Sequence, residues 1–248
     1  MENTILTTKA IEPRTLPQVH RAVLKIIKRL NPGAAVLDAP CGEGALLLRL
    51  QELGFKARGL DIDPLPSSSE KIQSQTWNLN MPPFPYDDES FDAITSVEGI
   101  EHLENPYALA REFHRILKPG GILILTTPNI TSIRSRIRFL GSGFFQMFSL
   151  PLNEARPSPA HHVTPLTLPH LRYALHRHGF TIENTSCSYV KPISLPYLIF
   201  APWIALYTLV AFRKEKDQEQ RRRNRQTLKW MLSWPVLMGE HLIITARK

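Results

Sequence analysis

The segment from Val36 to Asp63 restricts the fold of this chain more than any other stretch. It has the pattern of an apolar strand, a glycine-rich turn at residues 40–44 (PCGEG), a helix and a second strand. Gly54 suits the end of that helix, because glycine adopts positive φ angles without a steric penalty. Glycines let a ligand approach the backbone, a helix N-terminus offers free N–H groups, and an acid such as Asp61 can bind a ribose diol. The segment therefore predicts a βαβ unit that binds a ligand containing a ribose.

Helical and strand patterns alternate along the rest of the chain. We expect helices over residues 17–30, 45–53, 105–117 and 168–178. We expect strands over residues 36–38, 56–63, 75–80, 91–97, 122–127, 180–189 and 240–247. Residues 64–74 read as a short helix or a loop. Strands that alternate with helices predict an α/β fold with a mostly parallel, doubly wound sheet.

The composition fits a globular domain in a reducing compartment. The chain has 248 residues, of which 43% are hydrophobic and 21% charged, enough for one α/β domain with additional elements. Its two cysteines are Cys41, in the glycine-rich turn, and Cys187, so we expect no structural disulfide. Residues 1–17 lack the charged and apolar regions of a signal peptide. These features predict a cytoplasmic protein.

Acidic residues at the ends of the first two strands narrow the class of protein that the turn indicates. Asp38 precedes the glycines and Asp61 closes the next strand, a pattern that resembles the class I S-adenosylmethionine (SAM) dependent methyltransferases. Their first motif, acid-x-Gly-x-Gly-x-Gly, stands here as DAPCGEG, with Pro40 in place of the first glycine. LDIDP, PFPYDDESFDAITSVEGIEHLENP and REFHRILKPGGILILTTPN follow in the order of that superfamily. The resemblance implies a Rossmann-like, seven-stranded, mostly parallel doubly wound sheet with an antiparallel last strand, and SAM as the cofactor.

The resemblance also implies which residues bind the cofactor. The expected set is Asp38, Gly42, Gly44, Asp61, Ile62, Asn78, Leu79 and Glu98. The two glycines would lie beneath the methionine part of SAM, and Asp61 would accept hydrogen bonds from the ribose hydroxyls. Ile62 would pack on the adenine, whose amino group Asn78 and the backbone of Leu79 would contact. Pro40 removes one backbone N–H near the methionine amine.

A second set of candidate residues follows the strand at 91–97. If a helical turn begins at Glu98, then Glu98, Glu101 and His102 share one face, because residues three and four apart lie side by side. His162 lies in a later loop, which we expect to fold over the carboxyl edge of the sheet. Carboxylates and imidazoles together are ligands for divalent metals. The pattern therefore indicates a metal site next to the cofactor.

The pattern E-x-x-E-H with a distant histidine is similar to two groups of metal-dependent O-methyltransferases. The ubiquinone-biosynthesis type acts on catechol-type quinone precursors, and the other group methylates the terminal ribose 2′-hydroxyl of small RNAs. Both acceptors carry neighbouring hydroxyls. We hypothesise that Glu98, Glu101, His102 and His162 bind Mg²⁺ or Mn²⁺, which orients a vicinal diol. The alternative is a site without metal, where His102 is the catalytic base and Glu101 supports it.

Residues 192–238 form an apolar and basic insert before the last strand. Residues 192–212 carry no charge, whereas residues 213–229 contain eight basic and three acidic residues, a net +5 of the +8 in the whole chain. Internal prolines, and the need to return the last strand to the sheet, disfavour a single membrane span. A membrane-interface element, a lid over the acceptor pocket and a dimer face stay open. The basic stretch at 130–140 suits contact with lipid or with the pocket.

These observations divide the chain into four parts and predict its activity. The parts are an N-terminal helical segment (1–33), a SAM-binding core (34–191), the insert (192–238) and the last strand (239–248). We predict methyl transfer to a hydroxyl of a lipophilic or lipid-linked small molecule, of quinol, phenol or glycan type, with peripheral contact to a membrane. RNA ribose 2′-O-methylation is an alternative that the charge favours, although no recognised RNA-binding module is appended. A SAM-binding membrane-surface protein without catalytic activity is the third hypothesis.

Overall fold

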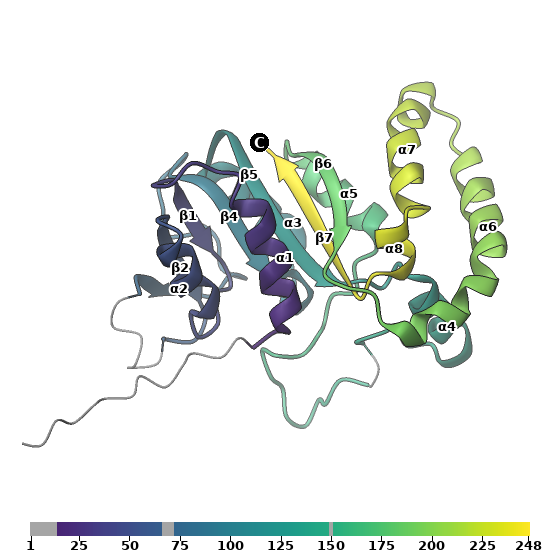
Figure 1. Cartoon of the computed structure of the whole chain (residues 1–248), viewed down its shortest axis with the longest axis horizontal. Coiled ribbons are helices and arrows are strands. Elements are labelled where there is room, and N and C mark those ends of the chain that lie inside the picture. Colours follow the sequence, from purple (N-terminus) through teal and green to yellow (C-terminus); the bar gives the residue numbers. More distant parts are fainter. Residues whose placement is uncertain (1–13, 66–71, 149–150) are drawn as a thin grey trace, which may run out of the picture.

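The computed structural model describes residues 14–65, 72–148 and 151–248 (Figure 1). Its strands form one seven-stranded sheet in the order β3-β2-β1-β4-β5-β7-β6. Strands β1 to β5 pair in parallel, and β7 runs antiparallel to β5 and β6. The Rossmann-like sheet with an antiparallel last strand is thereby confirmed. The strands are β1 (Ala35–Asp38), β2 (Lys56–Asp61), β3 (Ser74–Thr76), β4 (Phe91–Val97), β5 (Leu117–Pro128), β6 (Thr181–Cys187) and β7 (His241–Arg247).

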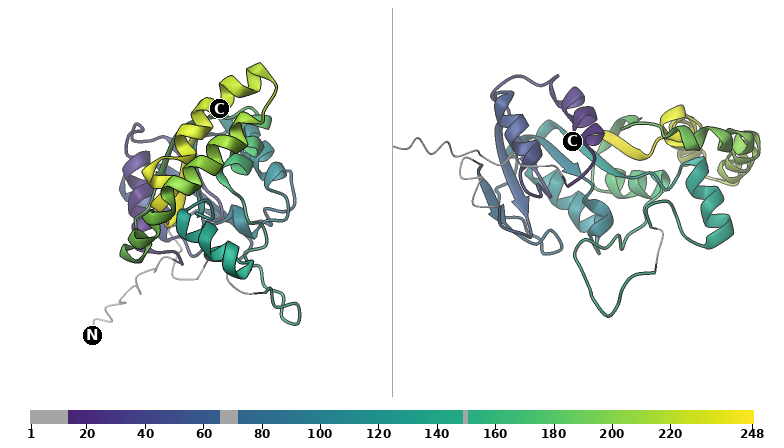
Figure 2. Two further views of the ribbon diagram at one scale, coloured as in Figure 1. Left: turned by 90° about the vertical axis from the view of Figure 1, so that its right-hand side faces the viewer. Right: turned by 60° about the horizontal axis from the view of Figure 1, so that its bottom comes forward.

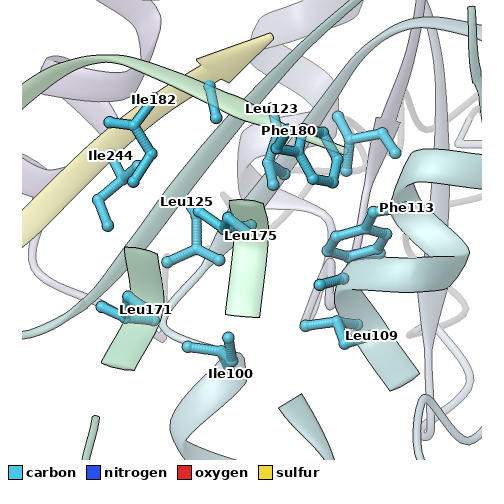
Figure 3. Packing of buried hydrophobic residues seen from close by; sticks show 14 of the residues in the cluster. Ile100, Leu109, Phe113, Leu123, Leu125, Leu171, Leu175, Phe180, Ile182 and Ile244 are labelled. Carbon is cyan, nitrogen blue, oxygen red and sulfur yellow. The ribbon is translucent and has the colours of Figure 1, made fainter. Parts of the chain in front are cut away.

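Helices cover both faces of the sheet, because alternate strand residues point to opposite sides. On one face, α1 (Pro17–Ile27) and α2 (Ala45–Glu52) pack on strand residues such as Ile124. On the other face, α3 (Pro106–Ile116) and α5 (Leu168–Arg177) pack on residues such as Leu125 (Figure 3). The remaining helices are the 3₁₀ helix η2 (Ile100–His102), α4 (Ile133–Ser142), the 3₁₀ helix η3 (Pro192–Phe200), α6 (Ala201–Arg213), α7 (Gln218–Met231) and α8 (Trp234–Met238).

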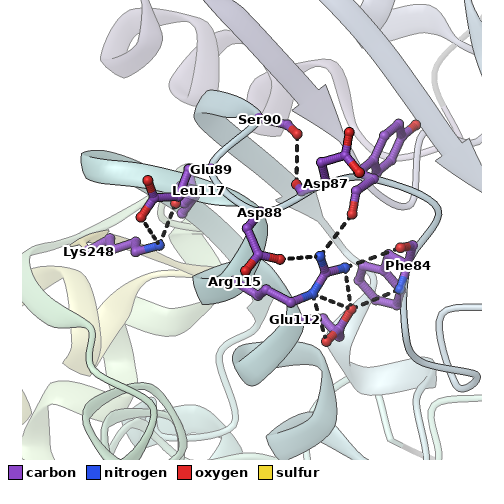
Figure 4. Close-up of polar contacts among 10 residues, drawn as sticks. Phe84, Asp87, Asp88, Glu89, Ser90, Glu112, Arg115, Leu117 and Lys248 are labelled. Carbon is purple, nitrogen blue, oxygen red and sulfur yellow. Dashed lines mark hydrogen bonds and ion pairs between the residues drawn. The ribbon is translucent and has the colours of Figure 1, made fainter.

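Arg115, at the end of α3, fixes the proline-rich loop that leads into β4 (Figure 4). Its guanidinium donates to the carbonyl oxygens of Phe84 and Tyr86, at 3.1 and 2.8 Å. It also donates to the carboxylates of Asp88 and Glu112, both at 2.8 Å. The planar guanidinium has five donors, so one side chain satisfies several partners at once. The loop between the adenine-side residues and β4 is therefore held in one path.

Two strands end earlier than expected, where a side chain captures a backbone N–H group. The third strand, expected over 75–80, ends at Thr76, and the Asn78 Oδ1 accepts a hydrogen bond from the N–H of Asn80 at 2.9 Å. β2 ends at Asp61, whose Oδ1 accepts a hydrogen bond from the N–H of Asp63 at 3.1 Å. Such local bonds compete with strand pairing. Both turns leave polar side chains at the carboxyl edge of the sheet.

Other predicted elements are present with shifted ends. β5 begins at Leu117 instead of Ile122, because Leu117 already pairs with Phe91 across an irregularity in the register. The predictions that fall on residues 1–13 and 66–71 lie outside the described part of the chain. The division of the chain into four parts stays a prediction.

The insert folds into helices that stand beyond the edge of the sheet (Figures 1 and 2). η3 continues into α6, a short connection at residues 214–217 follows, and α7 runs back beside α6. A short connection between helices makes them antiparallel neighbours. α8 then leads the chain into β7. We call η3, α6 and α7 the helical hairpin.

Candidate active site

A cavity of about 780 Å³ lies at the carboxyl ends of β1, β2 and β4, which are adjacent in the sheet. It is lined by seven of the eight residues predicted to bind the cofactor, Asp38, Gly42, Asp61, Ile62, Asn78, Leu79 and Glu98. Its lining also contains one arginine, Arg14, against six carboxylate residues, Asp38, Glu43, Asp61, Asp63, Glu98 and Glu104. In a chain with a net charge of +8, the cavity is therefore a local acidic region.

The glycine-rich turn after β1 is held by the acid at the end of β2. Gly42 has φ +54° and Gly44 has φ +88°, both in the left-handed region that favours glycine. The N–H of Gly42 donates to Asp61 Oδ2 at 2.7 Å. Gly44 does not line the cavity, and a Cβ there would lie 2.8 Å from the side chain of Ile72. Gly42 therefore faces the ligand, and Gly44 serves the turn and its packing.

Pro40, which replaces the first glycine of the motif, packs against Gly99. A Cβ at Gly99 would lie 2.2 Å from Pro40 Cδ. Only glycine therefore fits at position 99 while Pro40 occupies the turn. Sequence reasoning missed this pairing, although β1 and β4 are neighbours and each residue follows one of those strands. Because Gly99 directly precedes η2, this contact places the start of η2 next to the glycine-rich turn.

Asp38 is the most deeply placed acid on the cofactor side. It is buried at the end of β1, and its Oδ1 accepts a hydrogen bond from Thr95 Oγ1 at 2.6 Å. Burial, with repulsion from Asp61, raises the pKa of Asp38 to about 7 against the opposing effect of Thr95. A buried anion of this kind is stabilised by a cation. SAM carries positive charge on its amine and sulfonium, so the residues present fit this cofactor.

The adenine side is formed by the turns after β2 and β3. Ile62 is half exposed at the cavity, next to Asp61, and Asn78 and Leu79 also line it. Asn78 already accepts the Asn80 N–H, which leaves its carboxamide one further lone pair and its NH₂ group. These residues lie where the resemblance places them, and their cofactor contacts stay a prediction.

The second candidate set forms a compact group of three residues. One ligand atom each from Glu101, His102 and His162 lie within 4.8 Å of one another. Glu101 is completely buried, and its Oε2 accepts a hydrogen bond from Thr127 Oγ1 at 3.0 Å. Its Oε1 has no hydrogen-bond partner among the described residues. Burial and the neighbouring Glu98 raise the pKa of Glu101 well above its ordinary value.

Both histidines of this group are oriented by backbone carbonyl groups. His102 Nδ1 lies 3.0 Å from the carbonyl oxygen of His161, and His162 Nδ1 lies 2.9 Å from that of Met147. A carbonyl oxygen accepts, so each Nδ1 carries the proton and each neutral ring keeps Nε2 as a free acceptor. Burial lowers the pKa of His102 and of His162, and the charge of His102 lowers that of His162 further. The neutral forms are thus favoured.

The loop that contains His162 is docked on the backbone of η2. The N–H groups of Val163 and Thr164 both donate to the carbonyl oxygen of Glu101, at 2.8 and 2.9 Å. Thr164 Oγ1 donates to the carbonyl oxygen of Leu103. These bonds place His162 beside His102, with ring centroids 4.7 Å apart. The expectation that this loop folds over the carboxyl edge of the sheet is confirmed.

Glu98 does not share a helical face with Glu101 and His102, so that expectation is wrong. η2 begins only at Ile100, and Glu98 itself has φ +49°. Its carboxylate accepts a hydrogen bond from Thr126 Oγ1 at 2.7 Å and lies 3.5 Å from His241 Nε2. Burial raises the pKa of Glu98 to about 7. The left-handed residue turns the chain between Glu98 and the helical turn, so Glu98 faces β5 and β7 instead.

Two residues at this cavity were not anticipated from the sequence. His241, the first residue of β7, is buried and lines the cavity beside Glu98. Arg14 lies across the glycine-rich turn, 3.3 Å from Glu43 and 3.4 Å from Asp63. Only the sheet order brings β7 to this edge, and no motif in the N-terminal segment marks Arg14. Neither residue carried a signal that sequence reasoning could have used.

Comparisons with known proteins place this arrangement in a family. The sequence pattern of a family described as a methyltransferase domain matches residues 13–185, more than half of the chain. The chain belongs to this methyltransferase family and is a class I SAM-dependent methyltransferase, with SAM as its methyl donor.

Individual relatives agree with this assignment. A ubiquinone biosynthesis O-methyltransferase of Xanthomonas campestris is 32% identical over 121 residues, which are 46% of this chain and 51% of that protein. One of Xanthomonas axonopodis is 29% identical over 174 residues, 66% of this chain and 70% of that protein. The chain thus aligns with about half the length of the first relative. The structure of a SAM-dependent methyltransferase from Archaeoglobus fulgidus, 17% identical, covers 92% of this chain and 94% of that chain with a TM-score of 0.56, and supports the fold alone.

Proposed function

We propose that this protein methylates a hydroxyl group of a small, largely apolar acceptor with neighbouring hydroxyls, such as a catechol or quinol. In this proposal Glu101, His102 and His162 hold a divalent cation that orients the acceptor. One observation carries it: the buried Glu101 oxygen that has no partner among the described residues lies beside two histidines that line the cofactor cavity. Glu98, a ligand in our sequence hypothesis, is left out, because its carboxylate is engaged with Thr126 and His241.

A cation would resolve the electrostatic imbalance at Glu101. Leaving a buried polar atom unsatisfied costs roughly 1–3 kcal/mol, and more for a charged group. Metal-binding histidines usually donate their second ring N–H to a backbone carbonyl, as His102 and His162 do. One carboxylate and two imidazoles leave coordination positions for an acceptor, and the imidazoles favour Mn²⁺ over Mg²⁺. The residues present therefore fit a divalent cation.

The protein's own residues supply positioning and proton removal. Methyl transfer from a sulfonium is a direct displacement, so alignment of donor and acceptor is the main requirement. The acidic lining suits the cationic cofactor. In the alternative without metal, His102 Nε2 carries no cation and is free to take the proton from the acceptor hydroxyl. A bound cation would lower the pKa of that hydroxyl.

The wall beside the histidines supports an apolar acceptor. Leu103, Met147, Pro159 and Val163 line this part of the cavity. The printed names of the Xanthomonas relatives, ubiquinone biosynthesis O-methyltransferases, point the same way. RNA is the weaker candidate, because its phosphates would meet a cavity with six carboxylate residues and one arginine.

The test compares acceptors, metals and variants in one assay. The purified chain is incubated with labelled SAM and a catechol that carries an alkyl chain, or with the matched compound that has a single hydroxyl. EDTA is added, followed by Mn²⁺ or Mg²⁺. We expect transfer to the catechol only, loss with EDTA and recovery with Mn²⁺. Glu101→Gln should lower activity about 100-fold or more, whereas Glu104→Gln, an exposed carboxylate of the same cavity, should change it little.

Each other outcome selects a different hypothesis. Activity that resists EDTA and tolerates His162→Ala, but not His102→Ala, would support the metal-free base. Label in RNA from a cell extract would support the ribose methyltransferase. SAM binding by calorimetry without transfer to any fraction would support the non-catalytic hypothesis.

A further inference from the structure

The helical hairpin exposes its apolar side chains and buries its small polar ones. Ser194 and Thr208 are 4% and 6% exposed, whereas Ile199 and Tyr207 are 79% and 66% exposed. By length and composition alone Pro192–Arg213 could cross a membrane, and 11% of its most apolar 18-residue window is buried. A helix on a soluble surface has the opposite arrangement. The described part of the chain therefore leaves this apolar face uncovered.

Exposed apolar residues recur along η3 and α6, and we call them the apolar stripe. They are Ile193, Leu195, Ile199, Phe200, Trp203, Leu206, Tyr207 and Val210. Along α6 they recur every three or four residues and so share one side of the helix. Phe139 and Leu140, at the end of the neighbouring α4, are also exposed. Trp and Tyr suit a boundary between apolar and aqueous surroundings, because each ring has an apolar body and a polar group.

The hairpin cannot place its two ends on opposite sides of a membrane. It leaves the sheet from β6 and returns to it through α8 and β7, and β6 and β7 are hydrogen-bonded neighbours. The face can therefore lie in a membrane interface but cannot span the bilayer.

Basic side chains flank the apolar stripe. The exposed cations beside it are Arg213, Lys214, Lys216, Arg221, Arg222, Arg223, Arg225 and Lys229. Glu219 forms ion pairs with Arg222 and Arg223, and residues 213–229 keep a net charge of +5. A symmetric contact with a second copy would bring two such segments together, at a Coulombic cost. An anionic surface complements them instead.

A cavity of about 700 Å³ joins this basic region to the apolar helix. It lies between α5, α6 and α7, and Arg172, Lys214 and Lys216 line it together with Phe212. The guanidinium of Arg172 has no acceptor among the described residues, and burial and the charge of Arg223 lower its pKa. Thr227 Oγ1, buried in the lining, also has no partner in the described ranges. Cations and a hydroxyl donor of this kind suit a phosphate group.

The one carboxylate in this lining is already engaged. Glu215 Oε1 accepts hydrogen bonds from the N–H groups of Lys216 and Asp217, at 2.8 and 3.0 Å. We propose that the helical hairpin binds the surface of an anionic phospholipid bilayer, with the apolar stripe in the interface and a lipid phosphate in the Arg172 cavity. This surface is separate from the active site and does not depend on the identity of the acceptor.

The test measures binding to vesicles without any turnover. The full chain is floated with vesicles of phosphatidylcholine alone or mixed with phosphatidylglycerol, at low and high salt. We expect binding to the mixed vesicles, weakening as salt rises. Inorganic phosphate and glycerol phosphate are added as soluble competitors. If inorganic phosphate or glycerol phosphate binds the protein and the mixed vesicles do not, the site serves a free phosphate and the proposal fails.

Matched variants separate the two parts of the surface. Trp203→Ser with Leu206→Ser and Tyr207→Ser removes the centre of the apolar stripe. Replacing the four α7 arginines by Gln removes the charge (R221Q, R222Q, R223Q and R225Q). Each set should weaken vesicle binding by roughly 100-fold or more, and Arg172→Gln by roughly fivefold. The control sets are R21Q, K25Q, K28Q and R29Q, at exposed positions of α1 and directly after its end, and the exposed Met81→Ser. Neither control should change binding.

SAM affinity serves as the folding control for every variant, because no residue of the apolar stripe lines the cofactor cavity. Equal binding of the wild type and of the two hairpin variants would overturn the proposal. So would a dimer in light scattering that the stripe variant dissociates, because a second copy would then cover the face.

Discussion

The active-site cavity and the helical hairpin are opposite in chemistry but similar in one respect. The cavity buries acidic groups, and one oxygen of Glu101 lacks a partner in the described structure. The hairpin exposes apolar side chains in a basic setting. Each region therefore carries groups whose natural surroundings are absent from the chain itself. In our proposals, the missing component is a cationic ligand for the first region and an apolar, anionic surface for the second.

The largest expected effect is on the free energy of unfolding, which a substitution in the core should lower far more than one on the helical hairpin. Phe113 is completely buried in the core, edge to face with Phe84 at 5.9 Å between centroids. Phe113→Ala should lower the free energy of unfolding by about 3–5 kcal/mol, through lost burial and the remaining cavity. Leu206→Ser on the hairpin should change it by less than about 0.5 kcal/mol. Urea unfolding measures both. A cost for Leu206→Ser close to that of Phe113→Ala would mean that the stripe packs inside the protein.

The contact between Pro40 and Gly99 allows a sharper test of the cavity. Gly99→Ala should cost about 2–3 kcal/mol and weaken SAM binding, because its Cβ would overlap the Pro40 ring. Pro40→Gly in the same chain should recover most of both losses, since it restores the space. A thermal-unfolding double-mutant cycle gives the coupling. If the two changes in the free energy of unfolding simply add, the structure accommodates the new Cβ by other shifts. The contact with Pro40 is then not the reason for glycine at position 99.

The titration of Asp38 should make the free energy of unfolding of the protein depend on pH. Its pKa is about 7 in the fold and near 3.8 when exposed, so the folded state holds a proton that the unfolded chain has released. The stability contributed by this proton is complete below pH 3.8 and is lost as the pH rises to about 7. Asp38→Asn should therefore raise the free energy of unfolding by about 2 kcal/mol at pH 8 and by little at pH 4.

The same substitution should weaken SAM binding, because the cofactor cation loses its partner. The exposed Asp87→Asn is the control and should show no pH-dependent effect. Calorimetry at two pH values and unfolding curves in the absence of ligand measure the two quantities. A gain in stability that is equal at both pH values would contradict the assigned charge.

The sheet and its cofactor edge were predictable because local patterns determine them. Strand and helix periodicity from Val36 to Asp63 requires no distant contact. The helix expected over 105–117 is capped locally, since the Asn105 side chain accepts a hydrogen bond from the Ala108 N–H at 3.0 Å. The acids at strand ends met at one edge because parallel strands end there. For these parts of the chain, local chemistry and tertiary packing agree.

The predictions that were wrong or missing share one physical origin. In each case a specific side-chain contact overrides the local pattern, and the sequence does not reveal that contact. Glu98 takes a left-handed φ because Thr126 and His241 from distant strands hold its carboxylate. Residues 77–80 leave the sheet because a local Asn78 bond replaces strand pairing. The role of Gly99 depends on a proline nearly sixty residues earlier. None of these contacts has a periodic signature.

The place of β7 between β5 and β6 has a consequence for how the chain is made. Within the described part of the chain β6 pairs only with β7, and β7 is synthesised only after the whole hairpin. During translation the apolar stripe therefore emerges while β6 is still unpaired and His241 has not reached the cavity. If the hairpin binds lipid as we propose, a nascent chain exposes its membrane-binding surface before its cofactor site is complete.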